Sequence, residues 1–404
     1  MNVYFGSKRL RVPAGHGSFP LFAAAWLFAA SLNAAEQAPS SLKLQVTPNV
    51  SLRNEVKRAI TKGLEWLVRS QSKDGFWSSP DYPAMTGLGL CAFRLDPEAR
   101  GQGAEADAVR KGYTFLLSCV QSNGGIYRKE LPSYNTSIAL TALVLANRPE
   151  YTPAILNARK FVASLQVDLG QPGKLDSPFD GGIGYGSGDK QPDLSNTSFA
   201  LEAMAVSKNY VKDRNLTDEA DLNWQAAIHF IQSCQNLPAY NREPWVSDDP
   251  TNRGGFIYAP GRSMAGETNF ASGRVALRSY GSMSYAGLLS YIYADLKRDD
   301  PRVIAVVDWL KANFTVEENP ALGAQGLFYY YQMMAKALSV YGADAIELPN
   351  GTSVRWREQL ALKLINLQRA DGSWANDNGR WFEKDPALVT AYSVIALDLI
   401  YGKL

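Results

Sequence analysis

Two short stretches near opposite ends of the chain share one pattern, and its repetition decides the fold. Residues 62–77 read KGLEWLVRSQSKDGFW, and residues 368–374 read QRADGSW. In both stretches a glutamine is followed after four residues by a glycine and after six residues by a tryptophan. Self-similarity at fixed spacing indicates a repeat architecture, in which each unit packs mainly on its neighbours.

Four further copies lie between these two stretches. QSNGGIY at residues 121–127 keeps the same intervals, with Tyr127 in place of tryptophan. FDGGIGY at residues 179–185 and RGGFIY at residues 253–258 belong to copies with insertions after their glutamines. QGLFYYY at residues 325–331 ends a degenerate copy that has lost its glutamine. The chain therefore contains six copies.

Each copy is preceded by an amphipathic pattern and followed by a more apolar one. Before the first copy, apolar residues recur at helical spacing at Val56, Ile60, Leu64 and Leu67. After the second copy, NTSIALTALVLA (residues 135–146) is largely apolar. A half-polar helix suits an outer layer, whereas a helix that is apolar all round is buried. The pattern predicts an all-α fold, an α/α toroid of about six helix pairs over residues 51–404, with the last pair closing on the first.

The residues between the paired helices have a mechanical interpretation. A glutamine at the end of the outer helix can bond backbone groups that the helix leaves free. A glycine supplies a left-handed backbone or a close approach where the helix stops. We expect the aromatic side chain two residues later to pack over the turn.

The order of an aromatic residue, Gln and then Gly-x-Trp resembles the QW motif of squalene–hopene cyclases and the repeat of protein prenyltransferase beta subunits. The likeness extends from about Leu52 to Tyr401. It implies a toroid whose repeats hold the ring together without taking part in catalysis. It also implies a central cavity for an isoprenoid-like or other apolar molecule, and a terpene cyclase-like isomerase or lyase if the protein is active. Because one fold hosts many functions, the function has to be argued from the site.

Residues 1–35 are typical of a secretory signal. Three basic residues within the first eleven precede the uncharged, apolar residues 19–32, and small residues follow up to Ala35. The apolar run is short for a transmembrane helix. We expect export to the periplasm or the extracellular space, with residues 36–50 as a linker; an uncleaved N-terminal anchor is the alternative.

Composition limits the partners. A formal net charge of +2 argues against a nucleic acid as the main partner. Cys91, Cys119 and Cys234 lie in apolar helical patterns, where cysteine is usually a small buried hydrophobe. We expect no cofactor, and a peripheral membrane contact and the oligomeric state stay open.

The resemblance also raises the question of zinc, which prenyltransferases hold through Asp, Cys and His. This chain has no Asp-x-Cys string, and outside residues 1–35 its single histidine is His229. Because catalytic zinc usually takes three protein ligands, we expect no metal site and disfavour a zinc prenyltransferase.

Candidate acids follow from the same resemblance. Class II terpene cyclases protonate an alkene with an aspartic acid of an Asp-x-Asp-Asp motif, and VSDDPT at residues 246–251 is the only similar string. Its Asp248 and Asp249 fall in an insertion, so the capping of a turn is the competing interpretation. Asp193 and Asp385, at the starts of two apolar helical patterns, are the other candidate catalytic acids.

Polar and aromatic residues gather at the expected starts of the inner helices. In a closed toroid these starts converge on one mouth of the cavity, with helix N-termini directed at it. Aromatic faces there can stabilise carbocations or stack on sugars. Simple N-capping and packing is the competing interpretation. The candidate ligand-binding residues are Tyr134, Asn135, Asn196, Tyr280, Tyr330, Tyr331 and Trp381.

Three functions stay open at this level. The first is a binder of an apolar, isoprenoid-like molecule, which includes a divergent terpene cyclase. The second is a polysaccharide-acting enzyme, whose inverting form needs two carboxylates across the cavity, such as Asp193 and Asp385. The third is a non-catalytic exported binding or scaffold protein. An aromatic cavity with one carboxyl group would favour the first, two carboxylates in a wet groove the second, and a filled centre the third.

Overall fold

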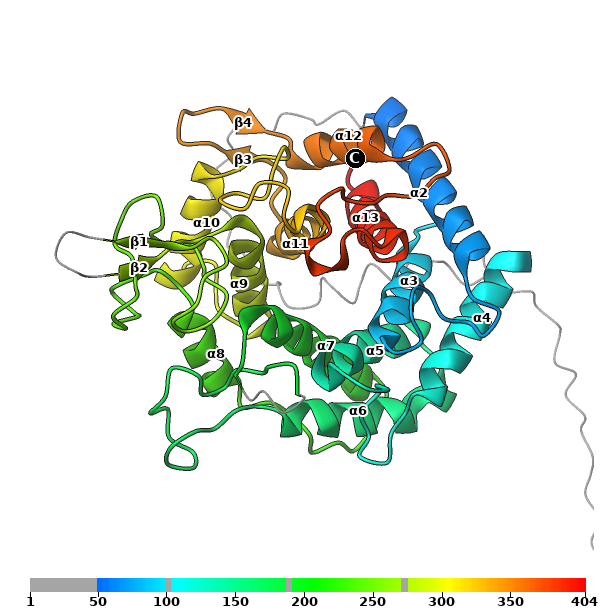
Figure 1. Ribbon diagram of the computed structural model, residues 1–404, viewed down its shortest axis with the longest axis horizontal. Coiled ribbons are helices and arrows are strands. Elements are labelled where there is room, and N and C mark those ends of the chain that lie inside the picture. Colours follow the sequence, from blue (N-terminus) through cyan, green and yellow to red (C-terminus); the bar gives the residue numbers. More distant parts are fainter. Residues whose placement is uncertain (1–48, 99–102, 187–190, 270–274) are drawn as a thin grey trace, which may run out of the picture.

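The computed structural model describes residues 49–98, 103–186, 191–269 and 275–404. In this part of the chain, twelve α-helices form two concentric layers (Figure 1). The outer helices are α2 (Val50–Ser70), α4 (Gly103–Ser118), α6 (Thr152–Ser164), α8 (Trp224–Ser233), α10 (Pro301–Ala312) and α12 (Trp356–Leu367). The inner helices are α3 (Pro83–Leu95), α5 (Pro132–Ala146), α7 (Leu194–Asp213), α9 (Gly281–Tyr293), α11 (Leu327–Tyr341) and α13 (Pro386–Tyr401).

Two short hairpins and two 3₁₀ turns lie in the connections between the helices. Two antiparallel hairpins, β1 (Glu267–Asn269) with β2 (Val275–Leu277) and β3 (Ile346–Glu347) with β4 (Ser353–Val354), lie in the connections after α8 and α11. Two 3₁₀ turns, η1 (Pro149–Tyr151) and η2 (Arg380–Phe382), precede α6 and α13. The predicted α/α toroid of six helix pairs is confirmed.

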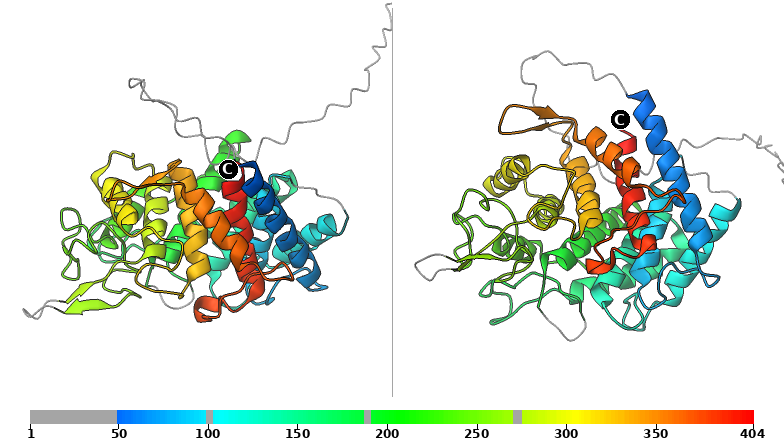
Figure 2. Two further views of the ribbon diagram at one scale, coloured as in Figure 1. Left: turned by 90° about the horizontal axis from the view of Figure 1, so that it is seen from above. Right: turned by 45° about the horizontal axis from the view of Figure 1, so that its top comes forward.

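The ring closes on itself. Each inner helix packs on the next one along the chain, and α13 packs on α3. In the outer layer α12 packs on α2. Figure 2 shows the helices side by side around the ring, with the red loop before α13 protruding at one face.

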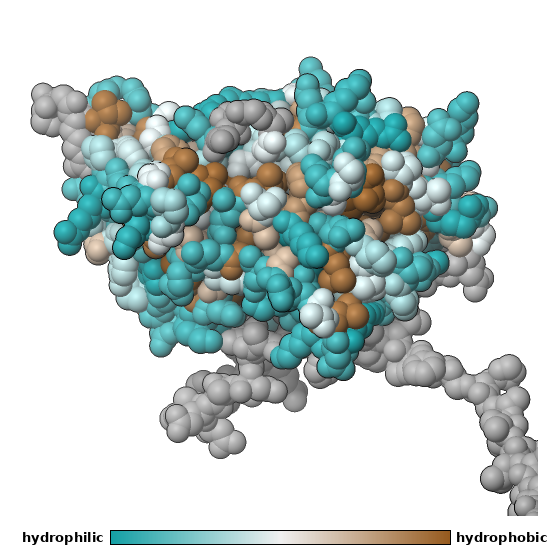
Figure 3. Space-filling model, turned by 90° about the horizontal axis from the view of Figure 1, so that it is seen from below, coloured by the Kyte–Doolittle hydropathy of each residue, from teal (hydrophilic) through white to brown (hydrophobic). Residues whose placement is uncertain are grey.

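The two layers have the polarity that the sequence predicts. On α5 and α13, buried residues occur on all sides of the helix, as expected for a helix enclosed by neighbours. On α2 the buried residues form one face. Figure 3 shows a side wall of the ring, where hydrophilic side chains surround separate apolar patches.

A glutamine joins neighbouring repeats at the end of several outer helices. The Gln71 amide donates to the carbonyls of Gly75 (2.9 Å) and Ala108 (2.8 Å), the latter on the next outer helix, α4. Gln166 and Gln235 make the corresponding pair of bonds to their own turn and to the start of the next outer helix.

The same bonds close the ring. The Gln368 amide donates to the carbonyls of Gly372 and Ala59, each at 2.9 Å, and Ala59 lies on α2, the first outer helix. The last repeat is thus joined to the first as the first, third and fourth repeats are joined to those that follow them.

The glycine of the turn allows this close approach. Gly75 has a φ of +92°, and a Cβ added there would collide with the carbonyl of Lys111 on α4. Gly372 repeats this arrangement, with a φ of +96° and an added Cβ 2.5 Å from the Lys62 carbonyl oxygen. The tryptophan two residues later completes the turn, since the Trp77 indole donates to the Leu67 carbonyl at 2.8 Å.

In the second copy the residues that correspond in structure to Gly75 and Trp77 lie one position earlier than the sequence interval suggests. Gly124, not Gly125, has the positive φ (+88°). Ile126 therefore takes the position of the tryptophan, and its amide donates to the Thr136 hydroxyl, as that of Trp77 does to Thr86. The glycine conformation determines the register of the turn, so Tyr127 is placed one residue further on.

The predicted signal, residues 1–35, lies outside the described residues, as does the predicted linker except for residues 49 and 50. Among the helices that the structure describes, none combines the length and the apolar character needed to cross a bilayer.

Replacing Gln368 by alanine removes the ring-closing hydrogen bond to Ala59 and the bond to Gly372 within its own turn. Because the carbonyls of Ala59 and Gly372 then lose a partner, we expect the free energy of unfolding, measured by urea denaturation, to fall by about 1–3 kcal/mol. Gln359, exposed on the same helix, provides the control. We expect Gln359→Ala to change stability by less than about 0.5 kcal/mol, and equal losses in both variants would contradict the closing role.

Gly181 tests the close approach in the third repeat. Its φ is +87°, and an added Cβ would collide with the Ala226 carbonyl of α8. Gly173 also has a positive φ (+76°), but an added Cβ meets no described atom within 4 Å. We expect Gly173→Ala to cost about 1 kcal/mol from backbone strain and Gly181→Ala at least about 3 kcal/mol. Similar unfolding midpoints for the two variants would show that close packing is not required there.

Candidate functional site

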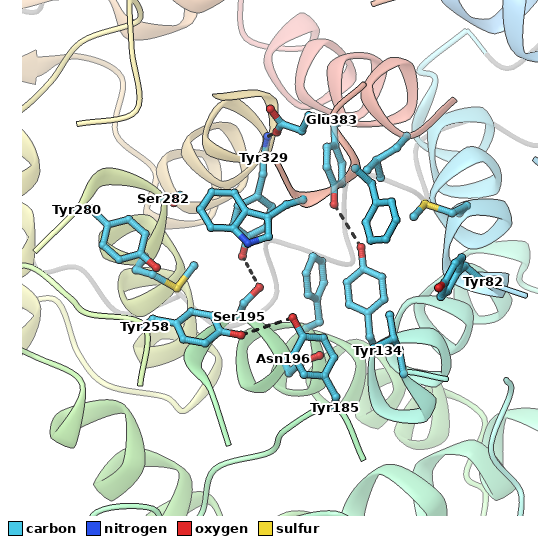
Figure 4. A pocket seen from close by; sticks show the side chains of 18 residues that line it. Tyr82, Tyr134, Tyr185, Ser195, Asn196, Tyr258, Tyr280, Ser282, Tyr329 and Glu383 are labelled. Carbon is cyan, nitrogen blue, oxygen red and sulfur yellow. Dashed lines mark hydrogen bonds between the residues drawn. The ribbon is translucent and has the colours of Figure 1, made fainter. Parts of the chain in front are cut away.

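A cavity of about 140 Å³ lies at the face of the ring where the inner helices begin. Eighteen residues line it, and Figure 4 shows their side chains converging from the inner helices and the loops before them. Ten of the eighteen are aromatic: Tyr82, Tyr134, Tyr185, Phe199, Tyr258, Tyr280, Tyr329, Trp381, Phe382 and Tyr392. Four are aliphatic: Met85, Leu131, Met283 and Leu388. The wall is thus largely apolar.

Four of the seven candidate ligand-binding residues line this cavity, namely Tyr134, Asn196, Tyr280 and Trp381. Asn135 does not: its side chain accepts from the Ala84 amide at 2.8 Å and donates to the Glu130 carbonyl at 2.8 Å. It joins α5 to the start of α3 and does not cap its own helix, whose N-cap is Leu131.

Three consecutive tyrosines of α11 point in different directions. Tyr330 and Tyr331 are fully buried between helices, and their hydroxyls donate to the carbonyls of Thr315 and Val316. Tyr329 lines the cavity instead. Since successive helical residues are turned by about 100°, only one of three neighbours faces the ring axis, and the start of the helix decides which.

The aromatic rings pack on each other across the cavity. The rings of Tyr134 and Phe199 pack edge to face, with their centroids 5.3 Å apart, and the ring centroids of Phe199 and Tyr329 are 6.1 Å apart. The hydroxyls of Tyr134 and Tyr392 are hydrogen bonded at 3.3 Å. Burial raises the pKa of Tyr134 to about 12 and also raises that of Tyr392. These hydroxyls are therefore neutral donors at neutral pH.

Asp193 is the buried N-cap of α7. Its carboxylate accepts from the backbone amide of Asn196 at 2.9 Å and from the Asn196 side chain at 2.6 Å. Burial raises its pKa to about 6, against the opposing effect of these hydrogen bonds and one from Tyr258. Asp193 does not line the cavity itself, but its partners Asn196 and Tyr258 do.

Tyr258 connects Asp193 to the cavity wall. Its hydroxyl donates to that of Tyr185 at 3.5 Å (Figure 4). Burial, and then the charge of Asp193, raises the pKa of both tyrosines. Asp193 and Tyr258 thus lie close enough to interact, and Tyr258 and Tyr185 both line the cavity.

Among the residues that the structure describes, Glu383 is the only carboxylate that lines the cavity, and the sequence patterns did not indicate it. It is 1% exposed and accepts from the backbone amide of Tyr329 at 2.8 Å and from the Asn376 side chain at 2.6 Å. It thereby caps the N-terminus of α11, while burial raises its pKa. Its sequence neighbourhood is an irregular loop, and periodicity carries no signal for a loop residue that caps a distant helix.

The remaining candidate acids lie outside the cavity wall. Asp385 is the N-cap of α13, where it accepts from the Ala387 amide at 2.8 Å and from the Ser78 hydroxyl. Asp248 and Asp249 lie in the insertion between α8 and α9. Asp249 accepts from the amide and hydroxyl of Thr251, which lowers its pKa. Asp385 thus caps a helix and Asp249 a turn, as the capping interpretation predicts.

Metal ligands are not gathered anywhere in the described ranges: no group of three or more His, Cys, Asp or Glu side chains there could hold a metal ion. His229 makes a 3.0 Å hydrogen bond to the Ser177 carbonyl on the outside of the ring.

Comparison with known proteins places this ring among similar folds. No family model matches the chain. A terpene cyclase/mutase from Nectria sp. is 28% identical over 147 residues, which cover 33% of this chain. The matched region spans 20% of the length of that curated relative.

Two solved structures have the same ring. A type II terpene cyclase from Scytonema superimposes with a TM-score of 0.50 at 11% identity, covering 88% of this chain and 99% of that one. An alpha-1,6-mannanase of Salegentibacter sp. superimposes with a TM-score of 0.54 at 10% identity, covering 85% and 99%. The solved structures show that the chain has an α/α toroid fold, and the sequence match shows that part of it is similar to a terpene cyclase/mutase.

Proposed function

We propose that the protein binds an apolar, isoprenoid-like small molecule in the cavity at the starts of the inner helices. The observation that carries this proposal is the wall itself, in which fourteen of eighteen residues are aromatic or aliphatic. Apolar walls with a few placed polar groups are typical of small-molecule sites. Export to the periplasm or the extracellular space is part of the proposal and rests on residues 1–35.

The competing functions fit this cavity less well. An inverting glycosidase needs two carboxylates on opposite sides of a site that also holds water. In the described part of the wall one carboxylate, Glu383, is present, and both of its oxygens accept hydrogen bonds from the protein. A filled centre, which would favour a scaffold, is at odds with a cavity of about 140 Å³.

The size of the cavity limits what it holds without rearrangement. An engineered apolar cavity of about 150 Å³ takes up benzene, so about 140 Å³ suits one ring or one short branched unit. A longer ligand would displace Trp381 and Phe382, which line the mouth and are 40% and 57% exposed. Both residues have a positive φ, a conformation that costs about 1–3 kcal/mol in a bulky residue.

The proposed chemistry is proton transfer to a double bond of such a ligand. Below about pH 6 Asp193 carries a proton, and its carboxyl group would donate a hydrogen bond to the Tyr258 hydroxyl. The Tyr258 hydroxyl would give its proton to the ligand and take that of Asp193. The resulting cation, stabilised by aromatic faces, would return a proton to the pair when a new double bond forms, as in an isomerisation or cyclisation.

Filling the cavity tests the binding proposal. Leu388 lines the wall, and Leu362 is 47% exposed on α12. In calorimetric titrations with an acyclic isoprenoid hydrocarbon, we expect Leu388→Trp to weaken binding at least about tenfold, because the indole occupies the cavity. Leu362→Trp serves as the size-matched control, and we expect wild-type affinity and a negative heat-capacity change of binding. Binding of an alpha-1,6-mannan oligosaccharide but not of the hydrocarbon would overturn the proposal.

Asp193 predicts a pH dependence of stability. Its pKa is about 6 in the folded protein, against 3.8 when unperturbed, so the folded state holds more protons between these values. The contribution of Asp193 to the free energy of unfolding is therefore fully present below about pH 4 and is lost as the pH rises through 6. Asp193→Asn keeps the capping oxygen and removes the titration. We expect the variant to gain about 3 kcal/mol relative to wild type between pH 4 and pH 7 in urea unfolding; parallel pH profiles would refute the buried proton.

A further inference from the structure

The space enclosed by the inner helices, called the barrel below, continues beyond the cavity at the mouth. Phe199 lines that cavity and also a second one deeper along the barrel. The deeper cavity has a volume of about 20 Å³, enough for a single water-sized group. Its wall consists of mostly apolar residues of α3, α5 and α13, with Thr141 as the polar one among them, together with Phe199, Glu202 and Lys336. Phe199 is thus the partition between an upper and a lower cavity.

The lower cavity contains a buried ion pair that crosses the barrel. The Lys336 ammonium lies 2.8 Å from each carboxylate oxygen of Glu202, and the two side chains are 8% and 6% exposed. They come from α11 and α7, which are separated in the ring by α9. Replacing a buried pair by apolar residues of similar volume is often neutral or stabilising, so packing alone does not explain this pair.

Unpaired polar groups lie near the same level of the barrel. Within the described residues, neither the oxygen nor the nitrogen of the fully buried Gln332 amide has a hydrogen-bond partner. Gln332 lies on α11 between Tyr329 of the upper cavity and Lys336 of the lower one. The Tyr293 hydroxyl is also buried without a partner among these residues, and burial followed by the charge of Glu202 raises its pKa.

Gln332 and Tyr293 make the surroundings of the lower cavity polar, although neither residue lines it. The polar side chains that line the lower cavity itself, and that a ligand group can reach there, are Glu202, Lys336 and Thr141. The pair of Glu202 and Lys336 has no net charge, so a charged ligand group would add an uncompensated charge to the barrel. A neutral group is therefore favoured.

We propose that the lower cavity is a subsite for the hydroxyl end of an apolar alcohol whose carbon skeleton occupies the upper cavity. A hydroxyl matches the volume of about 20 Å³. It donates to the Glu202 carboxylate and accepts from the Lys336 ammonium, and the ring of Phe199 turns aside as the chain enters. This inference rests on the proposed function, because it needs an apolar ligand in the upper cavity.

The test compares an acyclic isoprenoid alcohol with the hydrocarbon of the same carbon skeleton. The double variant Glu202→Leu/Lys336→Met removes the pair without leaving one charge alone. We expect the alcohol-to-hydrocarbon affinity ratio to fall about tenfold relative to wild type, as for the loss of one hydrogen bond to a charged group. The exposed pair of Lys311 and Asp308 on α10 gives the control, Asp308→Asn/Lys311→Met. An unchanged ratio in the barrel variant would overturn the subsite.

The two proposals fail in different ways. If wild-type protein binds neither compound, the proposed function is wrong. If it binds both and the ratio does not respond to the barrel variant, only the subsite is wrong. A crystal structure of wild-type protein with the alcohol keeps the test independent of the variant's folding. We expect the alcohol oxygen within hydrogen-bonding distance of the Lys336 Nζ, and an oxygen located at the mouth instead would overturn the subsite.

Discussion

The hydrogen bonds of the glutamine at the end of an outer helix are the constraint on which the ring depends. Gln71, Gln166 and Gln235 each link their own turn to the next outer helix or its first cap. Gln368 makes the same link from the last repeat to Ala59 of the first. Because four of the six turns make this link and the last of them returns to α2, the helix pairs close into a ring instead of continuing as an open solenoid.

Closure determines where the chemistry lies. Every inner helix starts on the same face, so the capping groups of several helices meet around one cavity. Asp193 caps α7 and Glu383 caps α11, and both are buried beside or in the cavity wall. A helix N-terminus stabilises a carboxylate and burial destabilises it. For both groups burial has the larger effect, which leaves carboxyl groups with raised pKa values next to an aromatic surface.

The ring itself does not select a substrate. A terpene cyclase and a mannanase have similar rings, so the distinction has to come from the side chains that face the axis. In this chain they form an aromatic upper cavity, then Phe199, then the polar level of Glu202 and Lys336. An apolar body with one neutral polar end complements this order of surfaces along the axis.

The sequence by itself determined the repeat, the number of helix pairs and the two layers. These depend on local periodicity and on turns whose positive φ favours glycine. It also indicated Asp193 and Tyr134 near the mouth, since helix starts can be located from capping residues and apolar patterns. Only the tertiary structure decided that Tyr329 and not Tyr330 faces the axis, because a shift of one residue turns a helical side chain by about 100°. Glu383 likewise emerged only in three dimensions, since it caps a helix that begins more than fifty residues earlier, and no local pattern records a contact between segments so far apart in the chain.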